Sequence, residues 1–472
     1  MTHNEENRIQ VAPQNSGTVM IQSLTVISED VIIGKIFPFL EEHTALVLRS
    51  VCRSFDKAYF KQNFKYANIK RILYFINHGY VFDTLKYISL KPLPGTMVLT
   101  PLAKLPQLEY LDLRIDQNVG RKQFFNLPHT LRTLSVTNLL DFKSISTCNR
   151  LKSLKVHKGN SIPKLPDALK TLQSVIFYKN EVTNLSGLQT FHRFSRLTTL
   201  SLERSFQIDL ATFPNNLANI VNLNISGCNI QNLSSLKYLT QLKTLNLASN
   251  PGIILDSLPT QLTSLTELDL AKCALRVLET LQRFPSIENL TIKKWTSSPY
   301  AGPDRFANEV SISDIPTSLS GLKKLVFQGS NEEDFGHLTN FPQLQELILD
   351  FNRKINLRTL PKNLLLLKKI NLKYCNLQCS FYLRFYQKLE YVDLSDNLTL
   401  WSVTTPHTLP CLKVLKLRNC IYFDNLECLA KYGKRLRELD VRKRKSRCPK
   451  ISMAMMMPSS LAGAIIRQRY IP

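Results

Sequence analysis

Aliphatic residues recur along most of the chain in the template L-x-x-L-x-L, with polar or variable residues between the apolar positions. The second half of the template alternates apolar and polar residues, which is the period of a β-strand with one buried face. Sixteen copies fit between Leu85 and Leu436, and these fifteen steps give a mean period of about 23 residues. The copies begin at Leu85, Leu108, Leu131, Leu151, Leu172, Leu197, Ile220, Leu242, Leu265, Ile287, Leu322, Leu344, Leu367, Leu389, Leu412 and Leu436.

This template at this period is the pattern of a leucine-rich repeat, in which each repeat gives one strand to a continuous parallel sheet. The predicted fold class is therefore α/β, a leucine-rich-repeat solenoid over residues 85–445 with the parallel β-sheet on its concave face. The ninth template position supports this prediction, because a buried Asn or Cys recurs there in the turn after each strand. These residues are Cys228, Asn250, Cys273, Asn352, Cys375, Asn397 and Cys420.

Prolines indicate two alternating repeat types. In every second repeat a proline stands six residues before the next copy begins, as at Pro166, Pro214, Pro259, Pro316 and Pro361. Proline fixes φ and lacks an N–H, so it marks the place where the convex segment ends and the chain turns toward the next strand. We expect convex segments that are short and only partly helical, with single helical or 3₁₀ turns.

One repeat is longer than the others. The step from Ile287 to Leu322 spans 35 residues, and the additional sequence near 295–315 is rich in turn formers and aromatic residues. Insertions in a solenoid emerge as loops on one face. The segment is interpreted either as a tolerated surface loop or as a loop that binds a partner.

The N-terminal segment 23–66 has a different pattern. Ile32, Ile36 and Leu40 lie at helical spacing, Leu48 and Val51 continue it, and a third amphipathic piece follows from Phe55. About forty residues in three short helices bury too little core to be stable alone. The simplest interpretation is a helical cap that covers the first repeat.

The segments Val31–Leu40 and Ala45–Ala58 nevertheless resemble an F-box, with Ile36-Phe37, Leu40, the run Val51-Cys52-Arg53 and Phe55 at the family's positions. The family's Leu-Pro dipeptide is absent near Ser28. The whole chain thus resembles a fungal F-box/leucine-rich-repeat protein, and such proteins act as substrate receptors of SCF-type ubiquitin ligases. The resemblance implies a three-helix module that binds the SCF adaptor subunit and includes Ile32, Ile33, Ile36, Phe37, Leu40, Leu48, Val51 and Phe55.

The expected order of domains follows from these patterns. A disordered N-terminus (1–22) precedes the F-box-like module (23–66), a linker or cap (67–84), the solenoid (85–445) and a basic, apolar C-terminal tail or cap (446–472).

Recognition of a partner is expected on the concave face, where the polar template positions point away from the core. These positions carry an excess of cations interrupted by Asp112, Asp269, Asp393 and Asp440. Lysine and arginine clusters suit a protein partner with acidic or phosphorylated residues, whereas the plainer interpretation is solvated charge that keeps the array soluble. The candidate partner-binding residues are Lys155, His157, Lys158, Lys179, Lys368, Lys369, Lys373, Lys416 and Arg418.

Charge supports an anionic partner. The chain has 61 Lys and Arg against 36 Asp and Glu, which gives a net charge of +25. The run Arg442–Arg447 resembles a nuclear import signal or a nucleic-acid contact. The rival hypothesis is a scaffold without ubiquitin chemistry that binds nucleic acid or a chromosomal complex. It is less favoured because aromatic residues are few and scattered on the concave positions.

Other function classes find little support. The sequence has no GxGxxG, P-loop, HExxH or GxSxG motif, and its ten cysteines include no CxxC pair. We therefore expect no enzyme activity, metal or cofactor. The polar N-terminus and the lack of a long apolar run favour a cytoplasmic or nuclear protein without a membrane partner.

Overall fold

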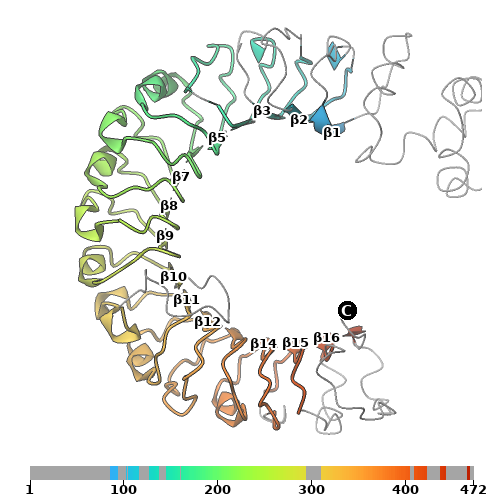
Figure 1. Ribbon diagram of the computed structural model, residues 1–472, viewed down its shortest axis with the longest axis vertical. Coiled ribbons are helices and arrows are strands. Elements are labelled where there is room, and N and C mark those ends of the chain that lie inside the picture. The colour runs from blue at the N-terminus through green and yellow to red at the C-terminus, as the bar shows by residue number, and fades with distance from the viewer. Residues whose placement is uncertain are drawn as a thin grey trace, which may run out of the picture.

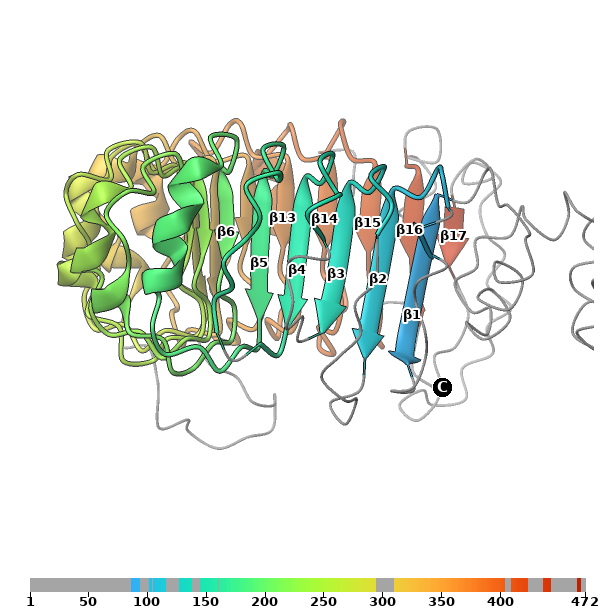
Figure 2. The ribbon, with the colours of Figure 1, turned by 90° about the horizontal axis from the view of Figure 1, so that it is seen from above.

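The computed structural model describes residues 86–93, 102–103, 105–115, 127–137, 145–159, 161–293, 310–403, 409–422, 436–442 and 465–467. These residues form a curved solenoid, in which strands line the inner side of an arc and short helices lie on its outer side (Figure 1). Seen from above, the first strands stand side by side and run in one direction (Figure 2).

The described residues build one sheet of 17 strands, and each strand pairs in parallel with the next one along the chain. The strands are β1 (Tyr87–Leu93), β2 (Tyr110–Ile115), β3 (Thr133–Thr137), β4 (Ser153–His157), β5 (Ser174–Tyr178), β6 (Thr199–Ser201), β7 (Asn222–Asn224), β8 (Thr244–Asn246), β9 (Glu267–Asp269), β10 (Asn289–Lys293), β11 (Lys324–Gln328), β12 (Glu346–Ile348), β13 (Lys369–Asn371), β14 (Tyr391–Asp393), β15 (Val414–Lys416), β16 (Glu438–Asp440) and β17 (Ile465–Arg467).

The predicted leucine-rich-repeat solenoid with a parallel sheet on its concave face is confirmed. Strands β1 to β16 fall on the sixteen template copies, and the register sets equivalent leucines side by side, such as Leu223, Leu245 and Leu268. One further strand, β17, extends the sheet within the segment assigned to the C-terminal tail or cap. The F-box-like segment 23–66, with its eight candidate residues, lies outside the described residues.

The long repeat leaves the sheet continuous. β10 and β11 pair over five residues, from Asn289 beside Lys324 to Lys293 beside Gln328, although the chain between them is longer than in other repeats. Part of the inserted segment is described: η11 (Ile312–Asp314) begins at a capping box formed by Ser311 and Asp314. Residues 295–309 lie outside the described part of the chain.

The outer segments alternate as the prolines predict. Longer 3₁₀ helices follow the odd-numbered strands β5 to β13, and short ones or turns follow the even-numbered strands. The longer helices are η6 (Ser186–Arg193), η8 (Ser234–Tyr238), η10 (Glu279–Arg283), η13 (Gly336–Asn340) and η14 (Phe381–Phe385), and the short ones are η7 (Leu210–Thr212), η9 (Leu255–Ser257), η11 and η12 (Thr317–Leu319).

The core lies between the sheet and the outer segments. Template leucines such as Leu242, Leu245 and Leu247 are fully buried, and Phe191 and Phe284 from the outer side fill the space behind them. Each buried leucine contributes about 1.5–3 kcal/mol relative to an exposed one. The repetition of this contribution from repeat to repeat holds the array together.

Ninth-position residues connect neighbouring repeats. Asn352 and Asn397 donate to the strand-end carbonyls of Phe327 and Leu372 in the preceding repeat, at 2.7 and 2.8 Å. The thiol of Cys375 donates to the equivalent carbonyl of Leu349 at 3.2 Å. Burial raises the pKa of this thiol to about 12. The interpretation of these cysteines as core residues is confirmed, and Cys228, Cys273 and Cys420 bond in the same way.

Candidate functional site

The last residue of many strands is an Asn or Asp with a structural role. Its carboxylate or amide oxygen accepts a hydrogen bond from the backbone N–H two residues later, as between Asn246 and Ala248 at 2.9 Å and between Asp393 and Ser395 at 3.0 Å. Asp269 bonds to Ala271 in the same way. Three of the concave aspartates, Asp269, Asp393 and Asp440, therefore stabilise the turn after the strand.

The eighth template position forms a left-handed column along one rim of the concave face. Residues there have φ near +60°, a conformation that favours glycine, yet glycine occupies only Gly227 and Gly329 among the described repeats. The other residues of this column are Lys158, Lys179, Arg204, Ser249, Lys272, Phe351, Tyr374, Asp396 and Asn419. Three neighbouring repeats thus place a long cation on the rim.

These rim cations surround an aromatic ring. Lys179 Nζ and Arg204 Cζ lie 5.6 and 5.8 Å from the ring centre of Tyr178, and Arg204 Nη1 donates to the Tyr178 hydroxyl at 3.2 Å. The imidazole of His157 meets the same ring edge to face at 5.6 Å. The ring orders the cations over β4 to β6, since cation–π contacts hold charged groups near an aromatic face.

Anionic partners are scarce in this cluster. Lys155, Lys158 and Lys179 form no ion pair with any described residue, whereas Arg204 faces Glu203 at 3.8 Å. Arg204 is exposed and Glu203 is half-buried, and an ion pair this open to solvent contributes little. We call this strand-end surface over β4 to β6 the cationic cluster (Lys155, His157, Lys158, Tyr178, Lys179 and Arg204). The charges of its three lysines are not compensated by an ion pair with a described residue.

Some candidate cations of the C-terminal half, unlike the lysines of the cationic cluster, form ion pairs with carboxylates. Lys373 Nζ lies 3.2 Å from the buried carboxylate of Asp393, and Lys369 Nζ lies 3.6 Å from Glu346. Lys369 and Lys416 also lie over the Tyr391 ring at 5.4 and 5.3 Å. Lys369 and Lys373 are thus paired with neighbouring carboxylates.

Two further cations complete this region. Arg418 is among the positive charges that act to lower the pKa of Asp440, and Lys368 acts in the same way on Glu390. For Glu390 the largest cause of the lowered pKa is its hydrogen bond from Lys413. The ion pairs of Lys369, Lys373 and Lys413 with carboxylates form a network across β12 to β15.

Buried carboxylates add to this network. Asp350 is only 7% exposed, and burial raises its pKa although Lys373 donates its backbone N–H to Oδ1 at 3.0 Å. Gln328 donates to Oδ2 of the same carboxylate at 3.1 Å. The hydrogen-bond acceptors of the Asp350 carboxylate are thus used by groups of the concave face itself.

The nine candidate residues therefore fall into two groups. Those on β4, β5 and the turns that follow them lie together, and the three lysines among them form no ion pair with a described residue. In the second group, near β13 to β15, Lys369 and Lys373 are paired with carboxylates. Sequence reasoning missed Arg204, which joins the first group from the next repeat. The eighth template position, compared between repeats, is the signal that reveals it.

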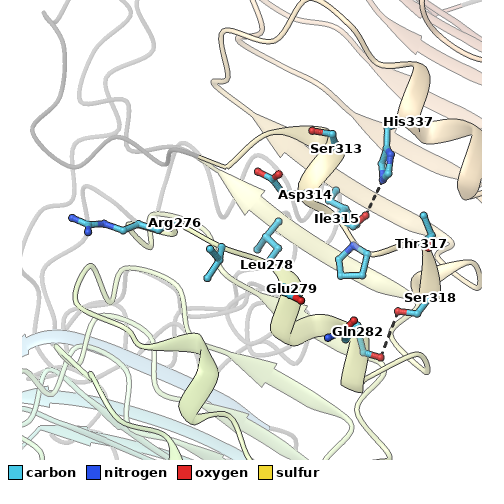
Figure 3. Close-up of a pocket in the computed structure, with 12 residues that line it drawn as sticks. Arg276, Leu278, Glu279, Gln282, Ser313, Asp314, Ile315, Thr317, Ser318 and His337 are labelled. Carbon is cyan, nitrogen blue, oxygen red and sulfur yellow. Dashed lines mark hydrogen bonds between the residues drawn. The ribbon is translucent and has the colours of Figure 1, made fainter.

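A cleft on the outer side is a second candidate site. It has a volume of about 430 Å³ and lies between η10, the pair η11 and η12, and η13 (Figure 3). His337 Nε2 lies 2.8 Å from the Ile315 carbonyl and so carries a proton, and Ser318 bonds to the Gln282 carbonyl at 3.5 Å (Figure 3). The lining mixes apolar, acidic and basic side chains without a cluster that indicates catalysis.

The described residues contain no grouping of three or more His, Cys, Asp or Glu side chains suited to hold a metal ion. They also contain no helix with the length and apolar character needed to cross a membrane.

The repeats and the parallel sheet define the class of this chain as leucine-rich-repeat proteins. No family model matches the chain, and no curated protein is similar enough to match. An internalin of Listeria monocytogenes is 18% identical, with 72% of this chain and 87% of that chain covered and a TM-score of 0.40.

Two further solved structures are similar. A leucine-rich-repeat protein of Leptospira interrogans is 20% identical, with 79% of this chain and 99% of that chain covered and a TM-score of 0.47. The mouse RP105/MD-1 complex gives 16% identity, coverage of 76% and 75%, and a TM-score of 0.47. These similarities concern the fold and carry no information on function.

Proposed function

We propose that this protein is an interaction adaptor whose concave face binds an anionic segment of a protein partner at the cationic cluster. The observation that carries the proposal is the difference between the two halves of the face. Lys155, Lys158 and Lys179 lack an ion pair among the described residues, whereas Lys369 and Lys373 are paired. A lysine that is already paired within the fold attracts an anionic partner less strongly. The binding surface is therefore the group of Lys155, Lys158 and Lys179.

The chemistry of the cluster suits carboxylate or phosphate groups. Lysine supplies point charges, and the Arg204 guanidinium supplies several donors in a fixed plane. Neighbouring strands lie about 4.8 Å apart, so β4 to β6 span about 10 Å, which matches three or four residues of extended peptide. The partner segment is therefore acidic or phosphorylated and short.

The N-terminal resemblance supports a more specific role. A segment with Ile36-Phe37 and Val51-Cys52-Arg53 at F-box positions would bind the SCF adaptor subunit and make the chain a substrate receptor in the cytoplasm or nucleus. Its contribution to ubiquitin transfer would then be proximity, since a held substrate meets the separate ligase enzyme in an effectively intramolecular step.

Fluorescence polarisation of the full chain tests the binding face. The probes are a labelled polyglutamate peptide, a phosphoserine peptide and a polyglutamine peptide of the same length. We expect the anionic peptides to bind and the variant Lys155→Gln, Lys179→Gln to weaken them about tenfold. The matched control is Lys323→Gln, Lys413→Gln, which removes two paired lysines. Equal loss in both variants would mean that only net charge matters and would refute the site.

A second experiment tests the ubiquitin role. Purified adaptor subunit is incubated with the full chain and with the variant Phe37→Asp, Val51→Asp. Binding that this variant loses, while it keeps the anionic peptides, supports the substrate-receptor role. If the folded full chain does not bind the adaptor, the substrate-receptor role is refuted. The N-terminal segment would then be a cap, and the function would rest on the concave face alone.

A further inference from the structure

A second cationic surface lies on the outer side of the solenoid, away from the concave face. It is formed by Arg358 and Lys362, from the turn after β12, together with four residues of η14, which follows β13 on the outside of the arc (Figure 1). We call it the outer aromatic patch, and its residues are Arg358, Lys362, Phe381, Tyr382, Arg384 and Phe385.

Cation–aromatic and ring–ring contacts connect all six side chains. The guanidinium carbon of Arg384 lies 3.7 Å from the ring centre of Phe381 and 5.0 Å from that of Phe385. Lys362 Nζ lies 4.6 Å from the Phe385 ring, and Arg358 lies 5.7 Å from the Tyr382 ring. Phe381 and Tyr382 meet edge to face at 5.8 Å. The patch is therefore continuous across two neighbouring repeats.

Its positive charge is uncompensated. Arg358, Lys362 and Arg384 make no ion pair within the part of the chain that the structure describes, and the acidic Glu333 of the preceding repeat is bound to Lys354 at 3.8 Å. Three like charges gathered in one place repel each other, and the aromatic rings offset this only in part.

The patch also exposes aromatic surface. Phe381 is 47% exposed, although a phenylalanine gains stability when it is buried. Other cation–aromatic pairs of the outer side are simpler: the ring beside Arg283 is the buried Phe284, and Lys237 lies over Tyr238 as an isolated pair. At η14, by contrast, Arg384 contacts the exposed ring of Phe381 and also lies over the half-buried Phe385, which Lys362 of the preceding repeat contacts as well.

We propose that the outer aromatic patch binds single-stranded nucleic acid. The three cations contact backbone phosphates, and unpaired bases stack on the exposed ring of Phe381 and on the Arg384 guanidinium plane. Interleaved aromatic and basic residues are the pattern that single-strand binding needs, because every base has a π-face and every nucleotide a charge. A duplex hides its base faces and would leave the rings unused.

The outer aromatic patch does not lie on the concave face, where aromatic residues are few and scattered. The net charge of +25 draws polyanions to the whole molecule, and the patch gives them a place to stack. It is separate from the cationic cluster, so the two surfaces are able to act independently.

The test is fluorescence anisotropy of the full chain with labelled oligothymidylate at low salt. The patch variant is Phe381→Ser, Arg384→Gln, Lys362→Gln, and the matched control is Tyr238→Ser, Lys237→Gln, Arg283→Gln. We expect the patch variant to weaken binding at least tenfold and the control to change it less than about twofold. Removing two phosphate contacts should also reduce the slope of log affinity against log salt by about 1.4.

The same samples are tested with phosphatidylserine vesicles and with the polyglutamate peptide. The patch variant should keep its affinity for polyglutamate, which separates this proposal from the concave one. The proposal is overturned if the wild-type protein does not bind the oligonucleotide, or if both variants lose equal affinity for it. It is also overturned if the patch variant loses vesicle binding but keeps its affinity for the oligonucleotide. A single variant, Phe381→Ser, keeps every charge and isolates stacking.

Discussion

The side-chain amide of Asn250 donates a 3.0 Å hydrogen bond to the carbonyl oxygen of Ile225 in the preceding repeat. Its Oδ1 accepts from the backbone N–H groups of Cys228 and Ile230 at 3.0 and 2.9 Å. One repeat later, the thiol of Cys273 donates to the Leu247 carbonyl, but a thiol is a weak acceptor. A ninth-position asparagine therefore satisfies both the N–H donors and the carbonyl acceptor of the preceding repeat, whereas a ninth-position cysteine satisfies mainly the carbonyl.

This asymmetry predicts unequal effects of two substitutions. Asn250→Ala orphans two buried N–H groups and should cost about 3 kcal/mol or more, whereas Cys273→Ala should cost about 1–2 kcal/mol. Urea unfolding measures both values, and hydrogen exchange at the amides of Cys228 and Ile230 locates the damage. Equal costs, or unchanged exchange at those amides, would contradict the assigned role of Asn250.

The left-handed column predicts a gain in stability. Ser249 and Lys272 have φ of 61° and 59°, where an L side chain is strained and glycine is not. Ser249→Gly and Lys272→Gly should each raise the free energy of unfolding by up to about 1 kcal/mol, because relief of strain exceeds the added entropy of the unfolded chain. Thr244→Gly, within β8, is the control and should lower it.

The solenoid could be predicted from sequence because its core repeats one short template. Leu223, Leu245 and Leu268 occupy equivalent buried places, so the period alone fixes the strands and their register. The alternation of outer segments was also readable, since prolines such as Pro214 and Pro259 end the short ones.

The division of the concave face could not be predicted. Lys155 and Lys373 are both lysines at polar template positions, and only the contacts made in space show that Asp393 neutralises the second. The outer aromatic patch is not predictable from sequence for a similar reason, because Arg358 and Tyr382 are distant in sequence and meet only when repeats stack.

Paired and unpaired concave lysines should differ in their effect on stability. Lys373→Ala leaves the carboxylate of Asp393, which is 1% exposed, without its cation and should cost about 1–2 kcal/mol after allowance for the partly exposed lysine. Lys155→Ala removes a cation without an ion pair among the described residues and should change stability by less than about 0.5 kcal/mol. Chemical unfolding at low and high salt checks both values. A large cost for Lys155→Ala would show that this residue is structural.

Two aspartates should give pH effects of opposite sign. Burial raises the pKa of Asp350, so its folded form binds a proton more tightly than the unfolded chain does. Stability from this group is therefore gained as pH falls through the raised pKa and is absent at neutral pH. Burial also acts to raise the pKa of Asp440, but the hydrogen bonds and charge of Arg442 outweigh it and the pKa is lowered. Stability from Asp440 is present at neutral pH and is lost as pH falls from the ordinary carboxyl pKa to the lowered one.

Replacement by asparagine should reveal this difference. Asp350→Asn keeps an oxygen that accepts from the backbone N–H of Lys373, removes the buried charge and should stabilise the protein at pH 7 by an amount on the order of 1 kcal/mol. Asp440→Asn loses the charge that Arg442 binds at 2.6 Å and should destabilise it at pH 7. Unfolding free energies are measured from pH 7 down to pH 3. Each variant should lack the part of the wild-type pH dependence that its carboxyl group causes, because that titrating group is gone. If both variants shift stability in the same direction at pH 7, the opposite environments assigned to Asp350 and Asp440 are wrong.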